Sequence, residues 1–102
     1  MGKNRDRESL IRIVANIVVH EILARHTNKS ESTHFLSSEI IEYRSQAEET
    51  SEEHSWNTDD KKYAEEKALK MIKDKLAAKY SDISCSEEEI IETLKKLIEE
   101  IM

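Results

Sequence analysis

The stretch from Leu10 to Ala24 carries apolar residues on more than one side of the helix that its spacing predicts. At about 100° per residue, its leucine, isoleucine, valine and alanine residues fill an arc of roughly 200°. A surface helix needs only one apolar stripe, so other parts of the chain must cover this segment on several sides. The fold must therefore contain a nearly enclosed central helix.

The remaining side of this helix is polar, but two apolar residues interrupt it. Arg12, Asn16 and His20 recur at every fourth position and form a line opposite the apolar arc. Val19 and Leu23 lie on that polar side, where the stripes of three covering helices are not expected to reach. We therefore expect either a packing that sandwiches the helix or a second protein chain against it.

The composition predicts an all-helical fold. The 102 residues include a single glycine, at position 2, and no proline. The turn chemistry of β-hairpins and of nucleotide-binding α/β folds is therefore missing. Charged residues make up 37% of the chain, enough to give every helix a solvated face. A chain of this length is expected to form one domain, residues 1–102, with one core.

Hydrophobic periodicity and capping residues divide the chain into four helices. We predict them at about 6–26, 34–54, 58–80 and 87–101. The second has a narrow seam that loses its apolar residues after Ala47, so residues 45–55 are expected to be its least firmly held part. Short connections favour antiparallel neighbours, which predicts a compact, antiparallel, bundle-like domain with helix 6–26 at its centre.

Metal-ligand motifs are incomplete in this sequence. His20-Glu21 begins like the zinc-binding HExxH motif, but position 24, where the second histidine belongs, is alanine. Glu31 and His34 form one ExxH unit, whereas a di-iron bundle needs two. The four histidines and Cys85 show no metal-ligand spacing. We therefore predict no metal ligand, no cofactor and no catalytic residue, and expect that the protein is not an enzyme.

Two alternative functions remain open on weaker patterns. The basic N-terminal segment can contact nucleic-acid phosphates, which would make the protein a nucleic-acid-associated regulator. Two acidic residues dilute this segment, and no aromatic residue is interleaved for base stacking. Its cations are Lys3, Arg5, Arg7 and Arg12.

The second alternative is a Mg²⁺-dependent hydrolase with a carboxylate site. Two ExxE pairs match the first half of the ExxE…ExxD pattern by which all-α nucleotide pyrophosphohydrolases hold Mg²⁺. No ExxD follows anywhere in the chain, so the pattern is half complete. The pairs are Glu39 with Glu42 and Glu49 with Glu52.

Glu21 projects into the apolar arc of the first helix, with Arg25 one turn further along. A carboxylate in such a position must find a partner or shift its pKa. We expect either an internal Glu21–Arg25 pair or a polar pocket at the end of the bundle, formed by Glu21, Arg25 and His20.

The surplus of apolar surface leads to the main functional hypothesis. We predict a small helical interaction or regulatory module that acts through self-association or by binding a protein partner. A membrane is not expected as a partner, because the run from Ile13 to Val19 is far shorter than the about 20 residues of a spanning helix. A lone cysteine and the lack of a signal-peptide pattern favour the cytoplasm. The predicted interface consists of Val19, Leu23, Ile90, Leu94, Leu97 and Ile101.

Overall fold

The computed structural model describes residues 3–26, 30–79 and 85–102, together with their side chains except those of residues 30–36. In these ranges the backbone forms four α-helices and no strand, which confirms the predicted all-α class. The helices are α1 (Lys3–His26), α2 (Ser30–Glu52), α3 (Thr58–Lys79) and α4 (Glu87–Ile101). None of these helices combines the length and the hydropathy that a membrane crossing requires.

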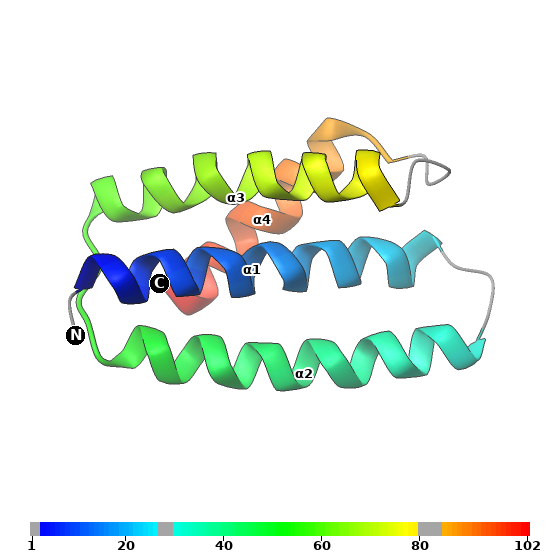
Figure 1. Cartoon of the computed structure of the whole chain (residues 1–102), viewed down its shortest axis with the longest axis horizontal. Helices are drawn as coiled ribbons and strands as arrows, with labels where there is room; N and C mark the ends of the chain where they lie inside the picture. Colours follow the sequence, from blue (N-terminus) through cyan, green and yellow to red (C-terminus); the bar gives the residue numbers. More distant parts are fainter. Residues whose placement is uncertain (1–2, 27–29, 80–84) are drawn as a thin grey trace.

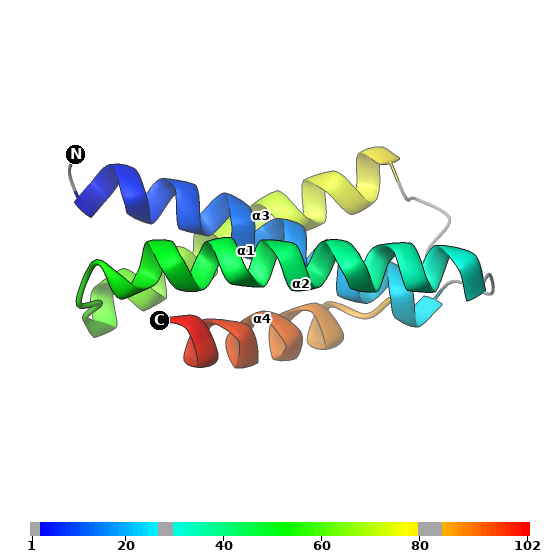
Figure 2. The same cartoon turned by 90° about the horizontal axis from the view of Figure 1, so that it is seen from below.

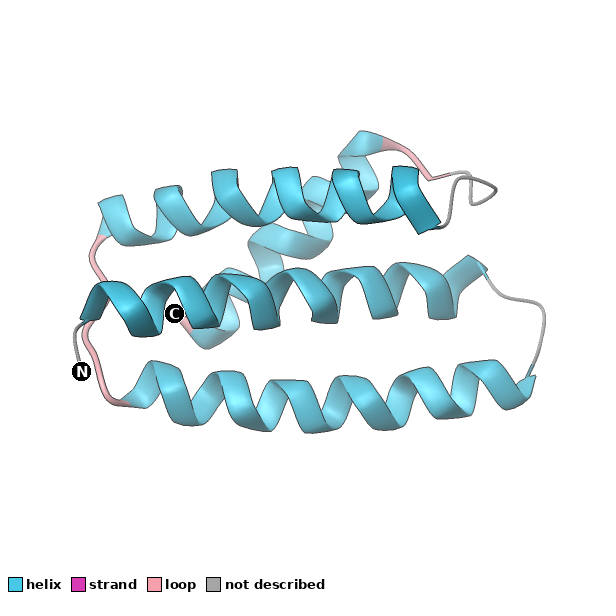
Figure 3. Ribbon diagram, viewed as in Figure 1, coloured by secondary structure: helices cyan, strands magenta, loops and turns pink. Residues whose placement is uncertain are grey.

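The helices α2, α1 and α3 lie side by side in one layer, with α1 in the middle (Figure 1). Helix α4 crosses one face of this layer, as the view turned by 90° makes clear (Figure 2). The chain reverses direction between α1 and α2 and again between α2 and α3, so α1 runs antiparallel to α2 and parallel to α3 (Figure 3). Helix α1 is therefore covered by other helices on three sides.

Local capping explains where two of the helices begin. The Ser86 side chain caps α4 and accepts a 3.1 Å hydrogen bond from the backbone N–H of Glu89, so α4 occupies the predicted range. At the start of α3, the Asn57 side chain accepts a bond of 2.8 Å from the backbone N–H of Asp60. The Asp60 carboxylate accepts a bond of 3.2 Å from the backbone N–H of Asn57 in return. This reciprocal pair satisfies two N–H groups that a helix start would otherwise leave open.

The core is built around α1, which contributes eight buried residues. Helix α4 adds a stripe that includes Leu94, and α3 adds small side chains such as Ala64 and Ala68 that let α1 approach closely. The buried residues of α1 are Leu10, Ile11, Val14, Ala15, Ile17, Val18, Val19 and Ile22. These span the broad arc that the sequence predicts.

The six residues predicted to form an interface lie inside this fold. Leu94 is fully buried and Val19 is only 3% exposed. Leu23 is partly buried and packs against the core. The other three, Ile90, Leu97 and Ile101, are also buried. The apolar surface of α1 that suggested contact with a second chain is therefore buried within this chain. The three covering helices bury more of the α1 surface than the narrow apolar stripes in their sequences indicate.

Several helix bounds differ from the predicted ones. Helix α1 begins three residues earlier, at Lys3, and α2 runs from Ser30 to Glu52 rather than over 34–54. Helix α3 is described to Lys79, so the predicted end at Tyr80 lies outside the described residues. The first turns of α1 and α2 contain few apolar residues, so hydrophobic periodicity does not reach them.

The C-terminal part of α2 is fixed by polar contacts. Ser51 is buried in this turn, at 5% exposure. Its hydroxyl donates to the carbonyl oxygen of Ile101 at 2.6 Å and accepts from the Trp56 indole N–H at 2.8 Å. The hydrophobic pattern of the sequence does not reveal these contacts, because both are polar and the bond to Ile101 joins residues 50 positions apart.

Candidate functional site

A polar pocket of about 140 Å³ lies where α1, α2 and α4 meet. At about 30 Å³ per water molecule, it has room for a few waters or for a small ion or head group. Ligands of drug size occupy pockets of about 300–1,000 Å³, so this pocket suits a smaller group. It is lined by Glu21, Arg25, Arg44, Thr93, Lys96, Leu97 and Glu100.

Arg25 connects the α1 wall of the pocket to α4. Its Nη1 donates to the Thr93 hydroxyl at 2.9 Å and approaches the Glu89 carboxylate at 3.5 Å. Its Nη2 is 4.0 Å from the Glu21 carboxylate, so the predicted Glu21–Arg25 pair is present as a long contact. The shorter bonds of Arg25 therefore go to α4, which leaves Glu21 with a distant partner.

The remaining charges come from α2 and α4. Arg44 pairs with Glu100 across the pocket. Lys96 lines the pocket and makes no ion pair with another described residue. With Arg25 and Glu21, the lining comprises three cations and two carboxylates, so it carries one surplus positive charge.

Glu21 is the carboxylate that this environment perturbs most. Burial raises its pKa from the ordinary value of 4.5, and the nearby Glu100 acts in the same direction. Three cations, Arg25, Arg44 and Lys96, oppose this effect but do not overcome it. A carboxyl group with a raised pKa in a pocket is a common feature of functional sites.

His20 does not take part in this pocket, although the sequence predicts it there. Its Nε2 lies 2.6 Å from the Glu39 carboxylate and its Nδ1 lies 2.7 Å from the backbone oxygen of Asn16. Its ring packs edge to face against Tyr43 at 5.4 Å. The predicted trio is thus divided, with Glu21 and Arg25 in the pocket and His20 between α1 and α2.

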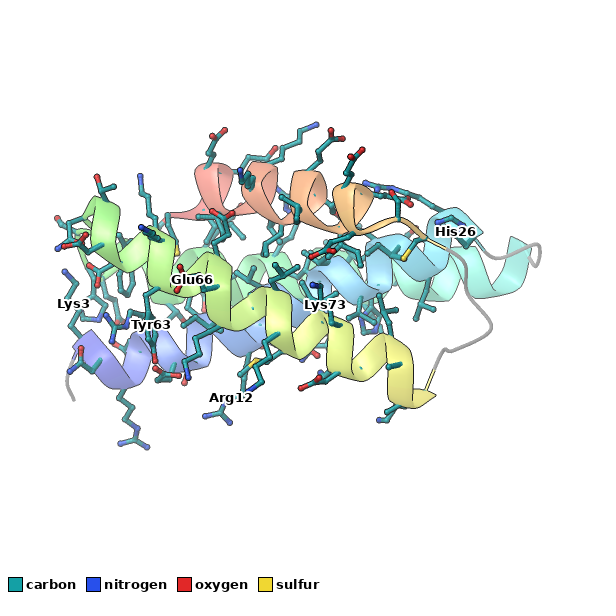
Figure 4. The ribbon with its side chains drawn as sticks, turned by 90° about the horizontal axis from the view of Figure 1, so that it is seen from above. Lys3, Arg12, His26, Tyr63, Glu66 and Lys73 are labelled. Carbon is teal, nitrogen blue, oxygen red and sulfur yellow. The ribbon has the colours of Figure 1, made fainter. Side chains whose placement is uncertain are left out.

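The basic N-terminal segment is partly neutralised within the protein. Lys3 and Arg7 each lie 3.0 Å from a carboxylate oxygen of Asp60 on α3. The guanidinium of Arg7 also stacks over the Tyr63 ring at 4.1 Å. Lys3 and Tyr63 lie toward the same end of the molecule, whereas Arg12 projects on the side away from α4 (Figure 4). Two of the four cations expected to meet phosphates are therefore occupied by Asp60.

The predicted ExxE pairs do not converge on a common point. Glu39 binds His20, and the other three glutamates, Glu42, Glu49 and Glu52, are exposed on α2. Among the described residues, a different group brings its ligand atoms together: Asp6, Glu53 and His54. No local spacing reveals this group, because 48 residues separate Asp6 from His54. Only the antiparallel arrangement of α1 and α2 brings the start of one helix to the end of the other.

Cys85 has the features of a structural cysteine. It is partly buried and packs against the core next to the start of α4. Burial raises the pKa of its thiol, and the nearby Glu89 adds to the effect. A raised pKa keeps the thiol protonated and unreactive.

Comparison with known proteins finds no matching family model, no similar curated protein and no similar solved structure. The functional interpretation therefore rests on the geometry of this chain alone.

Proposed function

We propose that this protein is a small helical binding module that recognises a small anionic group, such as a carboxylate or a phosphate, in the pocket between α1, α2 and α4. The observation that carries the proposal is the convergence of Arg25, Arg44 and Lys96, one from each helix, on a single pocket. Cations that packing brings together around one pocket favour an anion more than isolated surface cations do.

Lys96 is the group expected to meet the anion first. Arg25 is already bonded to Thr93, and Arg44 to Glu100, whereas Lys96 makes no ion pair with another described residue. An anion beside Lys96 can also draw on Arg44 as that side chain exchanges partners with Glu100. The pocket thus offers the anion two cations: Lys96, and Arg44 when it releases Glu100 to bind the anion instead.

Burial of the predicted interface residues changes the form of the partner-binding hypothesis. Among the described residues, Ile41 is the large hydrophobic side chain left exposed, at 71%. Single exposed apolar residues are normal on protein surfaces, so Ile41 alone does not indicate a protein interface. Binding through charge in the pocket is therefore better supported than self-association through an apolar face.

The pocket geometry favours binding over catalysis. The Thr93 hydroxyl donates to the Glu89 carbonyl oxygen at 2.8 Å and accepts from Arg25, so it is engaged on both sides. A nucleophile of this type would need a neighbouring base to take its proton. We therefore propose a non-enzymatic protein.

We also propose that it resides in the cytoplasm, because its single cysteine gives no sign of an oxidising compartment.

Sulfate is a suitable probe, because its charge stays constant over the range in which Glu21 titrates. In an NMR titration at constant ionic strength, the backbone amides of Thr93 and Leu97 should shift saturably. Lys96→Met should weaken binding about tenfold, which corresponds to about 1.4 kcal/mol for one charge-assisted contact.

Lys95→Met is the matched control, because Lys95 faces Glu65 on α3 at 3.8 Å instead of lining the pocket. It should leave sulfate binding unchanged. A shift that never saturates, or an equal loss in both variants, would show that sulfate responds to general surface charge and would overturn the proposal.

A further inference from the structure

Helix α1 starts and α2 finishes at the same end of the layer (Figure 1), and a second cluster of polar side chains lies there. Asp6 comes from the first turns of α1, and Glu53 and His54 directly follow α2. One ligand atom from each of these residues lies within 4.8 Å of the other two. The shortest approach is 2.6 Å, between His54 Nε2 and an Asp6 carboxylate oxygen.

We propose that Asp6, Glu53 and His54 bind a divalent transition-metal ion of the Zn²⁺ type. One imidazole nitrogen and two carboxylates match the N/O donor sets that Zn²⁺ accepts, whereas Mg²⁺ and Ca²⁺ prefer oxygen alone. Ligand atoms around a tetrahedral zinc ion lie about 3.4 Å apart, given bonds of about 2.0–2.1 Å. His54 Nε2 and the Asp6 oxygen, 2.6 Å apart, would move slightly apart around an ion, and no pair of the three ligand atoms is separated by more than 4.8 Å, so small side-chain movements suffice.

The imidazole is held in place by its surroundings. The His54 ring packs edge to face against Trp56 at 5.3 Å. Trp56 is fixed in turn by its indole N–H, which donates to the Ser51 hydroxyl at 2.8 Å. The backbone N–H of His54 donates to the Ser51 carbonyl oxygen at 3.1 Å. This support orients Nε2 toward Asp6, which lowers the entropy cost of binding an ion there.

The two carboxylates differ in accessibility. The Asp6 side chain is 30% exposed, and Glu53 is exposed beside it. An ion can therefore enter from solvent on the Glu53 side and take the place of the His54–Asp6 hydrogen bond. Three protein ligands leave one tetrahedral position for water or for a donor atom of a partner. The bound ion would link the first turns of α1 to the end of α2 and stabilise the fold.

The first experiment uses the full chain without an affinity tag. Titration calorimetry with Zn²⁺ should give one saturable site per chain, and Zn²⁺ should raise the melting temperature. Trp56 is the only tryptophan and contacts His54, so it reports binding directly. Co²⁺, which quenches nearby indole fluorescence, should quench Trp56 saturably, and excess Zn²⁺ should restore the emission.

Glu53→Gln is the decisive variant, because an exposed side chain just beyond a helix can change without loss of the fold. It should weaken Zn²⁺ binding by at least about tenfold, because the loss of residues that only hold a metal ligand in place already weakens metal binding about 10–100-fold. Glu52→Gln, which alters an exposed glutamate one residue away and outside the cluster, should leave the affinity unchanged.

The histidine ligand has a matched control of its own. His26 also faces a carboxylate, with Nε2 3.2 Å from Glu89, but it belongs to no cluster of three such groups among the described residues. His54→Asn should weaken Zn²⁺ binding by at least as much as Glu53→Gln, and His26→Asn should have no effect. Circular dichroism checks that each variant keeps its helices.

Three results would overturn the metal site. The absence of saturable Zn²⁺ binding to the unmodified chain would show that Asp6 and His54 form a structural ion pair only. Binding that survives Glu53→Gln or His54→Asn would place the ion elsewhere. An equal loss in the control variants would show adsorption to the acidic surface.

Discussion

The hydroxyl group of Ser51 donates a 2.6 Å hydrogen bond to the backbone carbonyl oxygen of Ile101. This bond joins the last turn of α2 to the last turn of α4, two helix ends that are 50 residues apart in the sequence. The last carbonyl groups of a helix have no partner within the helix, so Ser51 satisfies one that would otherwise be open. Because Ser51 is buried, water cannot easily replace it.

Replacing Ser51 with alanine should therefore lower the free energy of unfolding by about 1–3 kcal/mol, the usual cost of an unsatisfied buried polar group. Urea denaturation followed by circular dichroism measures this difference. Ser45→Ala, on the exposed side of the same helix, should stay within about 0.5 kcal/mol of the unmodified protein. Equal effects of the two substitutions would show that the Ser51 bond does not hold the helix ends together.

Leu94 distinguishes a core role from an interface role. It is fully buried within one chain, so Leu94→Ala should cost about 2–5 kcal/mol by leaving a cavity. Sedimentation equilibrium at micromolar concentration should show a monomer for the unmodified chain. Ile41→Ala, which alters an exposed isoleucine, should change stability by no more than about 0.5 kcal/mol. A dimer that Leu94→Ala dissociates with little loss of chain stability would restore the interface hypothesis.

Asp60 should give the protein a measurable loss of stability in acid. A hydrogen bond from Lys3 lowers the pKa of this carboxyl group below its ordinary value of 3.8, and bonds from the Asn57 backbone and Arg7 add to the effect, although burial opposes it. Because the folded protein favours the charged form, this stabilisation is present above the unfolded pKa and is lost as the pH falls through the lower, folded value. Asp60→Asn should lower the free energy of unfolding at neutral pH.

The difference between Asp60→Asn and the unmodified protein should shrink as the pH falls below the ordinary value of 3.8 and through the lower, folded pKa. Urea denaturation across this range measures it. A difference that stays constant with pH would show that Asp60 acts through its helix cap and not through its charge.

Glu21 should show the opposite dependence. Burial raises its pKa in the folded protein, so the charged form is disfavoured there. Its contribution to stability is fully present below the unfolded pKa and is lost as the pH rises through the raised, folded value. Glu21→Gln removes this loss, so the variant should be at least as stable as the unmodified protein at neutral pH. Below about pH 4, where both side chains are neutral, the two proteins should converge.

Urea denaturation at a series of pH values tests this expectation. If Glu21→Gln is less stable at neutral pH and the difference disappears below about pH 4, the contact with Arg25 outweighs the cost of burial. Sulfate titration of the same variant gives a second reading, since removal of the negative charge beside Lys96 should strengthen anion binding at neutral pH.

The number of helices, their approximate ranges and the central position of α1 could all be predicted from local sequence patterns. Helical period and capping are local properties, so Ser86 and Glu89 were enough to define where α4 begins. The broad apolar arc from Leu10 to Ile22 required covering helices, and the structure supplies them. The proximity of Glu21 and Arg25 also follows from local spacing, because residues four apart share one face of a helix.

The contacts between charged and polar side chains of different helices could not be predicted in this way. Helical angles give the direction of a side chain from its own axis, but they do not say which neighbour it faces. The pairing of Asp6 with His54, the bond from Ser51 to Ile101 and the arrival of Lys96 beside Glu21 all depend on how α2 and α4 are placed around α1. The burial of Val19 has the same origin. Long-range packing fixes these contacts, and both proposed binding sites depend on it.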